Sequence, residues 1–311
     1  MIHGYYSRWI ARSTVGGAFG LANWPLINDL NLPNPQVRGP SIFYPPIVLD
    51  ETNPNNLAVG TDRINLDTSQ GTGGFPDANE ISLPGVTGTN DRISALNYVN
   101  SNLIYAATVN GRVFRCDRAG GAWTVRVLHA APLPNRWIWD VAPLPADVNT
   151  VVVVMAGYGV PGGHVWQGVV PAAGAATWTA ISGTAPSAVP DVSCSAFQID
   201  PLDGNTIYVG TDIGVFRTID GGVTWTNFSE GLPNVAIYDI KLHESGRLLR
   251  AGTHGRGMWE RRLDMLAMPD VQVFVRDHML HAGRVAPVNG IASPYAEPLQ
   301  GVAVGDQLFA W

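Results

Sequence analysis

One segment of this chain recurs several times, and its recurrence constrains the fold more than any other feature of the sequence. Residues 205–228 read NTIYVGTDIGVFRTIDGGVTWTNF, and residues 102–125 match them in register at Asn, Ile-Tyr, Thr, Val-Phe-Arg, Gly and Trp. Residues 56–66 and 247–259 match the first half of the segment, and residues 151–166 form a looser copy with a longer turn. The copies follow one another at roughly fifty residues, a period that is typical of propeller blades.

Within one period the sequence predicts four short antiparallel strands, A to D from the axis outward. Residues 192–199, 206–210, 215–218 and 224–228 are rich in β-branched or aromatic side chains and are closed by Gly, Asp, Asn or Pro. The 35 glycines and 23 prolines interrupt the chain too often for long helices. We therefore expect an all-β fold, a β-propeller of four-stranded antiparallel blades. About five to six blades are visible, either as a whole ring or as part of a larger one.

The sharpest turn signal is the TIDGGVTW of residues 218–225, a Ser/Thr-x-Asp-x-Gly-x-x-Trp pattern. Asp220 is placed to accept hydrogen bonds from backbone amides of its own loop, and Gly222 permits a backbone conformation closed to other residues. Trp225 is expected to pack its ring back against the blade. We interpret this set, with Thr218, as a structural turn.

This turn is the Asp-box, and the chain resembles bacterial Asp-box (BNR-repeat) β-propeller proteins. Relatives include sialidases, xyloglucan-degrading endoglucanases, sortilin-type receptors and photosystem assembly factors. The resemblance covers roughly residues 1–263, but residues 116–123 lack the hydroxyl residue and the aspartate, and Val15 replaces the aspartate near the start. It implies a secreted or cell-surface location in a larger bacterial parent protein. Because relatives with different activities share the box, it selects no single function.

Both ends of the chain depart from the repeat. Residues 1–40 align with the second half of a repeat, so either they form a partial blade whose strands close the ring with the last blade, or an upstream half has been lost. The remainder of the propeller extends to residue 263. Residues 264–311 carry no blade spacing and predict a short C-terminal β extension, a truncated module. The chain opens without the charged region and apolar core of a signal peptide.

Composition excludes several classes of partner. The net charge is −6 and no basic run offsets it, which argues against nucleic acid. No stretch of eighteen apolar residues predicts a membrane span. Cys116 and Cys194 are expected to be buried free thiols, and two cysteines without paired spacing do not predict a zinc site. We expect no cofactor, although carbonyls and Asp side chains in the channel could hold a structural calcium ion.

A ligand is expected at the mouth of the central channel, on the face that carries the turns from B to C and from D to A. Turns from B to C supply Asp62, Arg63, Asn110, Arg112, Tyr158, His164, Asp212, His254 and Arg256, and turns from D to A supply Arg136, Trp137, Trp139 and Tyr238.

Asp62 and Asp212 are the repeat-equivalent pair of carboxylates at this mouth, and a glycosidase needs two carboxyl groups. The alternative, which we favour, is that each aspartate stabilises its own tight turn. Asp140 and Asp239 are secondary candidates with the same alternative.

Other residues at the mouth suit ligand recognition. The arginines suit bidentate binding of a carboxylate, yet the Arg-Ile-Pro opening of sialidases is absent. Trp137 and Trp139 share one face of a strand and would stack sugar rings if exposed, although burial is the more common state of such rings. A turn histidine such as His254 is more often satisfied by backbone than used as a base.

Two functions follow from these observations. The first is a glycan-binding or protein-interaction module, a fragment of a larger secreted protein. The alternative is a glycoside hydrolase, sialidase-like or endoglucanase-like, with paired carboxylates at the channel mouth. We favour the first, because the sequence does not assemble a complete catalytic set.

Overall fold

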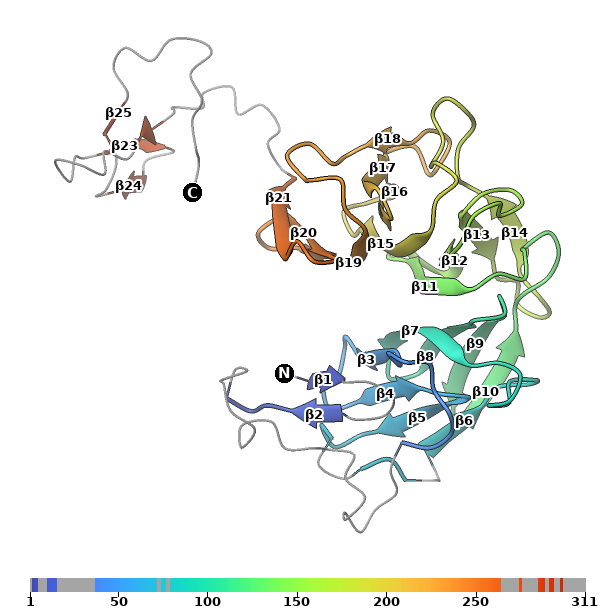
Figure 1. Cartoon of the computed structure of the whole chain (residues 1–311). Helices are drawn as coiled ribbons and strands as arrows, with labels where there is room; N and C mark the ends of the chain where they lie inside the picture. The colour runs from blue at the N-terminus through green and yellow to red at the C-terminus, as the bar shows by residue number, and fades with distance from the viewer. Residues whose placement is uncertain are drawn as a thin grey trace. The chain divides into compact units, whose positions relative to one another are not determined.

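The computed structural model describes residues 2–4, 10–15, 37–71, 74–76 and 79–263, and the backbone of four short strands after residue 263 (Figure 1). The chain divides into two compact units, Met1–Arg261 and Arg262–Trp311. All regular elements in the described ranges are strands, apart from a single 3-10 position at Asn79.

The first unit is built from antiparallel sheets whose strands follow chain order. Its strands are β1 (Ile2–Gly4), β2 (Ile10–Arg12), β3 (Ile47–Leu49), β4 (Leu57–Gly60), β5 (Arg63–Asp67), β6 (Glu80–Ser82), β7 (Ile93–Asn100), β8 (Leu103–Thr108), β9 (Val113–Ala119), β10 (Ala122–Val127), β11 (Ile138–Leu144), β12 (Asp147–Met155), β13 (Val165–Val169), β14 (Thr177–Ala180), β15 (Cys194–Asp200), β16 (Asp203–Thr211), β17 (Gly214–Thr218), β18 (Thr226–Asn227), β19 (Ile237–His243), β20 (Leu248–Thr253) and β21 (Met258–Arg262). Sheets β3–β6, β7–β10, β11–β14 and β15–β18 have four strands each, and the sheet β19–β21 has three in the described part. The predicted four-stranded antiparallel blades are therefore confirmed, and Figure 1 shows the sheets following one another around an arc.

In the four-stranded sheets, the second strand is buried on both faces over four to six consecutive residues. In β12 the run Val151–Met155 is fully buried, and its side chains alternate between two cores. Val151, Val153 and Met155 pack toward sheet β7–β10, whereas Val152 and Val154 pack toward sheet β15–β18. Because strand side chains alternate with a period of two, a continuous apolar run suits a strand covered on both sides. The cores of this unit therefore lie between successive sheets.

The innermost strands share an irregularity at the same point. In β7, β11, β15 and β19 the register shifts after the first residue, which leaves one extra residue in the inner strand, as in a β-bulge. The extra residues are Ser94, Trp139, Ser195 and Tyr238. The Ser94 hydroxyl donates a hydrogen bond to the Ile138 carbonyl oxygen at 2.5 Å, and Ser195 donates to Ile237 in the same way. The serine in the bulge thus bonds sheet β7–β10 to sheet β11–β14, and sheet β15–β18 to sheet β19–β21.

The two ends were the least regular parts of the sequence. β1 pairs with β2 in a two-stranded sheet. The prediction that residues 1–40 close the ring stays a prediction, and much of this range lies outside the described residues. The second unit contains β22 (Phe274–Val275) paired with β25 (Glu297–Pro298), and β23 (Val285–Val288) paired with β24 (Ile291–Ser293).

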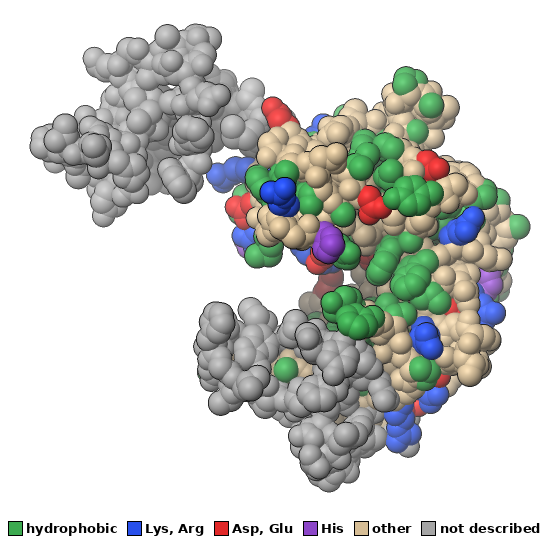
Figure 2. All heavy atoms as spheres, viewed as in Figure 1, with side chains coloured by type: hydrophobic (Ala, Val, Ile, Leu, Met, Phe, Trp, Pro, Cys, Tyr) green, Lys and Arg blue, Asp and Glu red, His purple; other side chains and the backbone are tan. Residues whose placement is uncertain are grey.

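Three further observations concern the described residues. Cys116 and Cys194 are buried and free. None of the described segments is a helix long and apolar enough to cross a membrane. In Figure 2 the basic and acidic side chains are scattered over the visible face and do not gather in one patch of a single sign.

Candidate functional site

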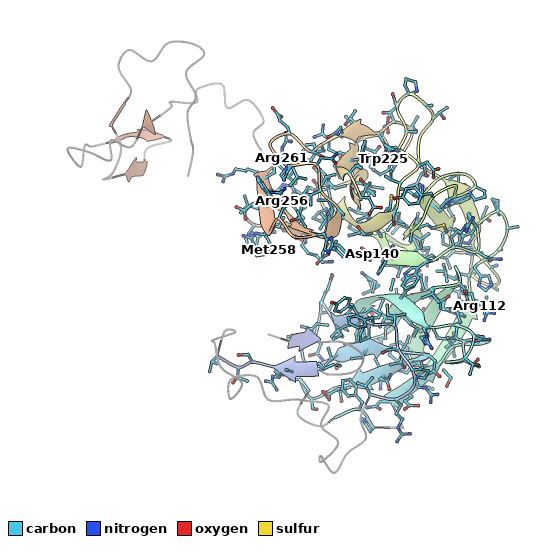
Figure 3. All side chains as sticks on the ribbon, in the orientation of Figure 1. Arg112, Asp140, Trp225, Arg256, Met258 and Arg261 are labelled. Carbon is cyan, nitrogen blue, oxygen red and sulfur yellow. The ribbon has the colours of Figure 1, made fainter. Side chains whose placement is uncertain are left out.

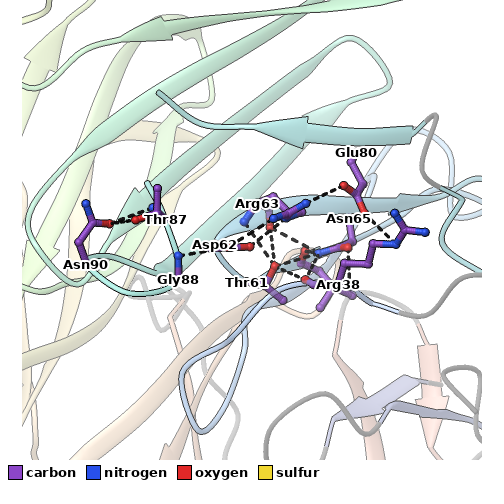
Figure 4. Close-up of polar contacts among 10 residues, drawn as sticks. Arg38, Thr61, Asp62, Arg63, Asn65, Glu80, Thr87, Gly88 and Asn90 are labelled. Atoms are coloured by element: carbon purple, nitrogen blue, oxygen red, sulfur yellow. Dashed lines mark hydrogen bonds and ion pairs between the residues drawn. The ribbon is translucent and has the colours of Figure 1, made fainter. Parts of the chain in front are cut away.

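Asp62 lies in the turn between β4 and β5 and is engaged in local contacts (Figure 4). Its side chain is 9% exposed and accepts hydrogen bonds from Arg63 Nε at 2.9 Å and from the Gly88 amide at 3.1 Å. Arg63 also pairs with Glu80 at 3.1 Å, and hydrogen bonds to Asp62 and Glu80 raise the pKa of Arg63 above its ordinary value. These contacts suit the turn-stabilising interpretation of Asp62.

Asp212 lies in the turn between β16 and β17, three blades away from Asp62. It accepts a hydrogen bond at 3.1 Å from the hydroxyl of Tyr158, a side chain that is 64% exposed. No described hydrogen bond or ion pair joins Asp62 to Asp212. Each carboxylate is thus bound to its own neighbours, and no contact assembles the two into a pair.

The other residues of the predicted mouth form small local groups. Arg112 pairs with Asp91 at 3.6 Å and donates to the Gly85 carbonyl oxygen, and Figure 3 marks its position. The rings of Trp137 and Trp139 lie 4.9 Å apart and are half-buried, and Trp139 packs against the core between its sheet and the next.

The remaining predicted residues divide into exposed and buried side chains. The ring of Tyr238, which is 55% exposed, lies 5.2 Å from the ring of His254. Arg136 and Arg256 are also exposed. His164 is 1% exposed, and its Nε2 lies 2.9 Å from Asp191. The predicted mouth residues therefore include a few exposed rings and side chains that bond to neighbouring loops.

The turn after β17 is closed by hydrogen bonds within itself. Asp220 accepts bonds from the Thr224 amide at 2.9 Å and from the Thr224 hydroxyl at 2.6 Å, and Thr218 donates to Asp220 at 2.7 Å. A side chain at Gly222, where φ is +92°, would meet the Ile181 carbonyl oxygen at 2.4 Å. The Trp225 indole is 3% exposed and donates to the same Ile181 oxygen at 2.8 Å. The hydrogen bonds of Thr218, Asp220 and Thr224 therefore hold the shape of the loop, and the Trp225 bond joins two sheets.

The bonds within this turn give a testable pKa. The Thr224 hydroxyl, the Thr224 amide and the Thr218 hydroxyl lower the pKa of Asp220 from 3.8 to about 2. Because a lowered pKa stabilises the folded state above the unfolded value, this contribution is lost as the pH falls from about 4 through about 2. We expect an NMR titration of aspartate carboxyl carbons to show this pKa in the wild type and a higher one in Thr224→Val. Thr226→Val, a neighbouring exposed control, should leave it unchanged, and a wild-type value near 4 would contradict the expected network.

A cavity of about 490 Å³ lies between the innermost strands. Its polar lining comes from Asn97 on β7, Asp140 on β11, Gln198 on β15 and Lys241 on β19, together with Glu51 and Glu244 from the turns after β3 and β19. Pro145 and Pro201, in the turns from the first to the second strand of their sheets, line it too. We call this cavity the channel pocket. It gathers polar groups from five sheets of the first unit.

The charges of the channel pocket influence one another. The carboxyl group of Asp140 is half-buried and accepts backbone hydrogen bonds from Val141 at 2.8 Å and Phe197 at 3.2 Å, and Figure 3 shows it on the inner side of the sheets. Desolvation raises the pKa of Asp140, and the charge of Lys241 only partly opposes it. For Lys241, desolvation lowers the pKa, but the carboxylates of Asp140, Asp239 and Glu51 outweigh it and raise the pKa overall. Lys241 therefore stays a cation facing several carboxyl groups.

The channel pocket lies at the opposite end of the strands from the predicted mouth, and of the carboxylates singled out in the sequence only the secondary candidate Asp140 lines it. Its turns run from the first to the second strand, whereas Asp62 and Asp212 lie in turns from the second to the third. In an antiparallel sheet these two sets of turns lie at opposite ends of the strands. A signal was present, because Asn97, Gln198 and Lys241 occupy the same register position, three residues after the extra residue of the bulge, in three inner strands.

In the described ranges, no group of three or more His, Cys, Asp or Glu side chains is arranged to hold a metal ion.

Comparisons with known proteins support the architecture. No protein-family model and no curated protein sequence matches the chain. The chain is similar to the β-propeller domain of Cps50 (Swd1) from Myceliophteria thermophila, with 14% identity, a TM-score of 0.52, and coverage of 72% of this chain and 67% of that one. It is also similar to an ancestral GH74 enzyme, with 17% identity, a TM-score of 0.54, and coverage of 81% of this chain and 33% of that one. The chain thus spans about a third of the length of the GH74 enzyme. These likenesses, together with the repeated four-stranded antiparallel sheets, show that the chain has the β-propeller fold.

Proposed function

We propose that the chain is a non-catalytic binding module of the Asp-box (BNR-repeat) type, from a secreted or cell-surface protein, and that it binds a carbohydrate in the channel pocket. The observation that carries the proposal is the polar lining of this pocket, where Asn97, Asp140, Gln198 and Lys241 face a common space. A volume of about 490 Å³ lies within the range of small-molecule sites.

The lining suits a ligand rich in hydroxyl groups. A hydroxyl both donates and accepts a hydrogen bond, an amide side chain does the same, and a carboxylate accepts while an ammonium group donates. Asn97 and Gln198 supply amides, Asp140 and Glu244 supply carboxyl groups, and Lys241 supplies the cation. The mixture of signs favours a neutral polyhydroxylated ligand over a strongly charged one.

A catalytic use of Asp62 and Asp212 receives no support from their surroundings. A glycosidase needs one carboxyl group to donate a proton and a second to act as base or nucleophile. Asp62 is bound to Arg63 and the Gly88 amide, and Asp212 accepts from Tyr158. Asp62 therefore contacts the loop between β6 and β7, Asp212 contacts the loop between β12 and β13, and no described contact brings the two carboxylates together.

A second candidate, glycoside hydrolysis, rests on Asp140. Desolvation raises the pKa of this carboxyl group, as a general acid requires, and Asp239 at the equivalent register position of β19 is the neighbouring carboxylate. The likeness to a GH74 enzyme is compatible with this candidate, which has its own test below.

The experiment is a glycan array probed with the full chain, followed by titration of each bound glycan. Lys241 is the single lysine of the chain, so Lys241→Met removes the cation of the pocket and little else. A hydrogen bond to a charged group contributes about 1.5–3 kcal/mol, so we expect the affinity to fall at least about tenfold. Arg256→Met is the matched control, because this exposed side chain lies outside the pocket.

Chromogenic glycosides separate the two candidates. Binding without turnover supports the module, and turnover that is lost in Asp140→Asn supports the hydrolase. Asp62→Ala and Asp212→Ala should leave glycan binding unchanged. Equal glycan affinity of Lys241→Met and the wild type, or no bound glycan from a folded chain, would rule out the pocket as a carbohydrate site. In that case the protein-interaction form of the binding module becomes the stronger hypothesis.

A further inference from the structure

Successive sheets of the first unit are joined by a repeated tryptophan contact. The Trp178 indole of β14 donates a hydrogen bond to the Leu128 carbonyl oxygen at 3.0 Å, and Leu128 directly follows β10 in the preceding sheet. Trp225, just before β18, donates to Ile181 at 2.8 Å, and Ile181 directly follows β14. Each indole is 3% exposed. In sheets β11–β14 and β15–β18, the outer part of the sheet therefore holds the sheet before it with one buried ring.

The same position exists at the next interface, between sheets β15–β18 and β19–β21. Phe228 directly follows β18, and its amide donates to Val215 at 2.8 Å, just as Leu128 donates to Val113 at 2.8 Å and Ile181 to Val165 at 2.9 Å. Phe228 is thus the equivalent of Leu128 and Ile181. Its carbonyl oxygen is the acceptor that an indole of a fourth strand in the sheet β19–β21 would use.

At this interface the acceptor is contacted by an arginine. Val215 on β17 and Met258 on β21 each follow a glycine. Counted from that glycine, Arg261 occupies the position in β21 that Thr218 occupies in β17. Arg261 Nη1 donates to the Phe228 oxygen at the long distance of 3.4 Å, and its guanidinium lies 3.9 Å from the centre of the Phe228 ring. Figure 3 shows Arg261 on the last sheet of the first unit. The Arg261 side chain is 39% exposed. A flexible, partly solvated guanidinium group therefore lies where the two preceding interfaces hold a buried tryptophan ring.

A groove of about 420 Å³ lies beside this arginine. Its apolar lining consists of Val215, Phe228, Leu232, Leu249, Ala251 and Trp259. Among the described residues, no strand pairs with the outer edge of β21. The groove therefore lies where this interface would hold a tryptophan contact, beside a strand edge to which the described part of the chain adds no fourth strand.

We propose that this groove and the edge of β21 bind an extended strand of a partner polypeptide, with a tryptophan of that strand in the groove. The partner strand adds to β21 as the fourth strand of its sheet, which is a known mode of peptide recognition. Its indole displaces the Arg261 guanidinium and donates its hydrogen bond to the Phe228 oxygen. β21 has five residues, so a partner segment of about five residues, roughly 17 Å long, covers its edge.

A peptide copied from the chain itself tests the proposal. The probe is a fluorescein-labelled peptide with the sequence of residues 218–229, TIDGGVTWTNFS, and the control peptide carries alanine in place of its tryptophan. We expect the full chain to bind the probe in fluorescence anisotropy, and the control peptide to bind at least tenfold more weakly. Arg261→Ala should tighten binding several-fold, because the indole then displaces no side chain from the Phe228 oxygen.

Substitutions in the protein locate the site. Leu232→Arg places a charge at the half-buried lip of the groove and should weaken the probe at least tenfold. Ile219→Arg is the matched control, because Ile219 is 62% exposed and does not line the groove, and it should leave the affinity unchanged.

Three outcomes would overturn the proposal. Equal affinity of the probe and its alanine control would show that the tryptophan plays no role in binding. No binding to the folded full chain would mean that the groove takes no added strand or is already covered by the chain's own residues. Dimerisation of the protein with affinity for its own groove, seen by analytical ultracentrifugation and lost in Leu232→Arg, would identify a second copy in place of a partner. None of these results depends on carbohydrate binding in the channel pocket.

Discussion

Replacing Trp225 by alanine is expected to lower the free energy of unfolding by about 3–5 kcal/mol. The indole is 3% exposed and packs in the core between sheets β11–β14 and β15–β18. Its removal leaves a cavity, and it also leaves the Ile181 carbonyl oxygen without the hydrogen bond from Trp225 Nε1. The expected loss of free energy has two parts. One is the transfer free energy of a large ring that is no longer buried, and the other is the cost of an acceptor that has lost its hydrogen-bond partner. Urea unfolding followed by far-UV circular dichroism measures it.

Two further variants separate the packing and hydrogen-bond contributions. Trp225→Phe keeps an aromatic ring but removes the N–H donor, so we expect about half of the loss or less. Val223→Ala lies in the same turn, where the side chain is 69% exposed, and should change the free energy of unfolding by less than about 0.5 kcal/mol. A loss below about 1 kcal/mol for Trp225→Ala would mean that this ring does not hold the two sheets together.

Arg247→Met is expected to cost about 3–5 kcal/mol, because it breaks a buried ion pair and leaves one charge behind. Arg247 lies in the turn after β19 and donates to both carboxyl oxygens of Asp200 at the end of β15, one of them at 2.9 Å. The side chains of Asp200 and Arg247 are only 6% and 17% exposed. The pair therefore joins two neighbouring sheets at the end of the channel where the turns from first to second strands lie.

The exposed pair of Arg250 and Glu260 provides the control for this experiment. Their nitrogen and oxygen atoms are 2.6 Å apart, but the side chains are 51% and 46% exposed. Since exposed ion pairs contribute little, Arg250→Met should cost less than about 1 kcal/mol. Similar losses for the two arginine variants would mean that burial of the Asp200 pair adds no stability.

The pH dependence of the two proteins adds a second readout. Desolvation raises the pKa of Asp200, but hydrogen bonds from Arg247 and from the Leu202 amide outweigh it and lower the pKa overall. A lowered pKa stabilises the folded state above the unfolded value of about 3.9, and the stabilisation is lost as the pH falls through the folded value. In Arg247→Met, Asp200 is still desolvated but has lost its arginine partner. Protonation of Asp200 then removes an unpaired charge, which stabilises the folded state of the variant. The difference in unfolding free energy between wild type and variant should shrink as the pH falls below about 4.

Much of the fold was predictable because its signals are local. The strands of residues 194–218 were expected within three residues at each end, since β-branched runs bounded by turn residues need no distant partner to be recognised. The turn around Asp220 was predictable for the same reason, because its hydrogen bonds join residues at most four positions apart. Residues 151–166 were expected as a looser copy of the repeat, and the buried run of β12 within them lies between two cores.

The candidate site was less predictable because it depends on which ends of different strands meet. Asp62 and Asp212 share a place in the repeat, yet Asp62 bonds to Arg63 whereas Asp212 bonds to Tyr158 of the neighbouring sheet. Asn97, Gln198 and Lys241 lie between 43 and 144 residues apart, and none belongs to a motif. Only their common register in inner strands, three positions after the extra residue of a bulge, brings them to the channel pocket.

The sequence by itself determined the blade, because each repeat carries the alternating hydrophobic residues and the turn residues that together predict the strands of one sheet. The tertiary structure alone decided which interfaces between blades are filled and which carry a groove. Trp225 reaches a carbonyl oxygen 44 residues away, and Arg261 takes the equivalent place at the next interface. Such contacts depend on how one sheet packs on another, and side chains from distant parts of the chain share that surface without leaving a local pattern.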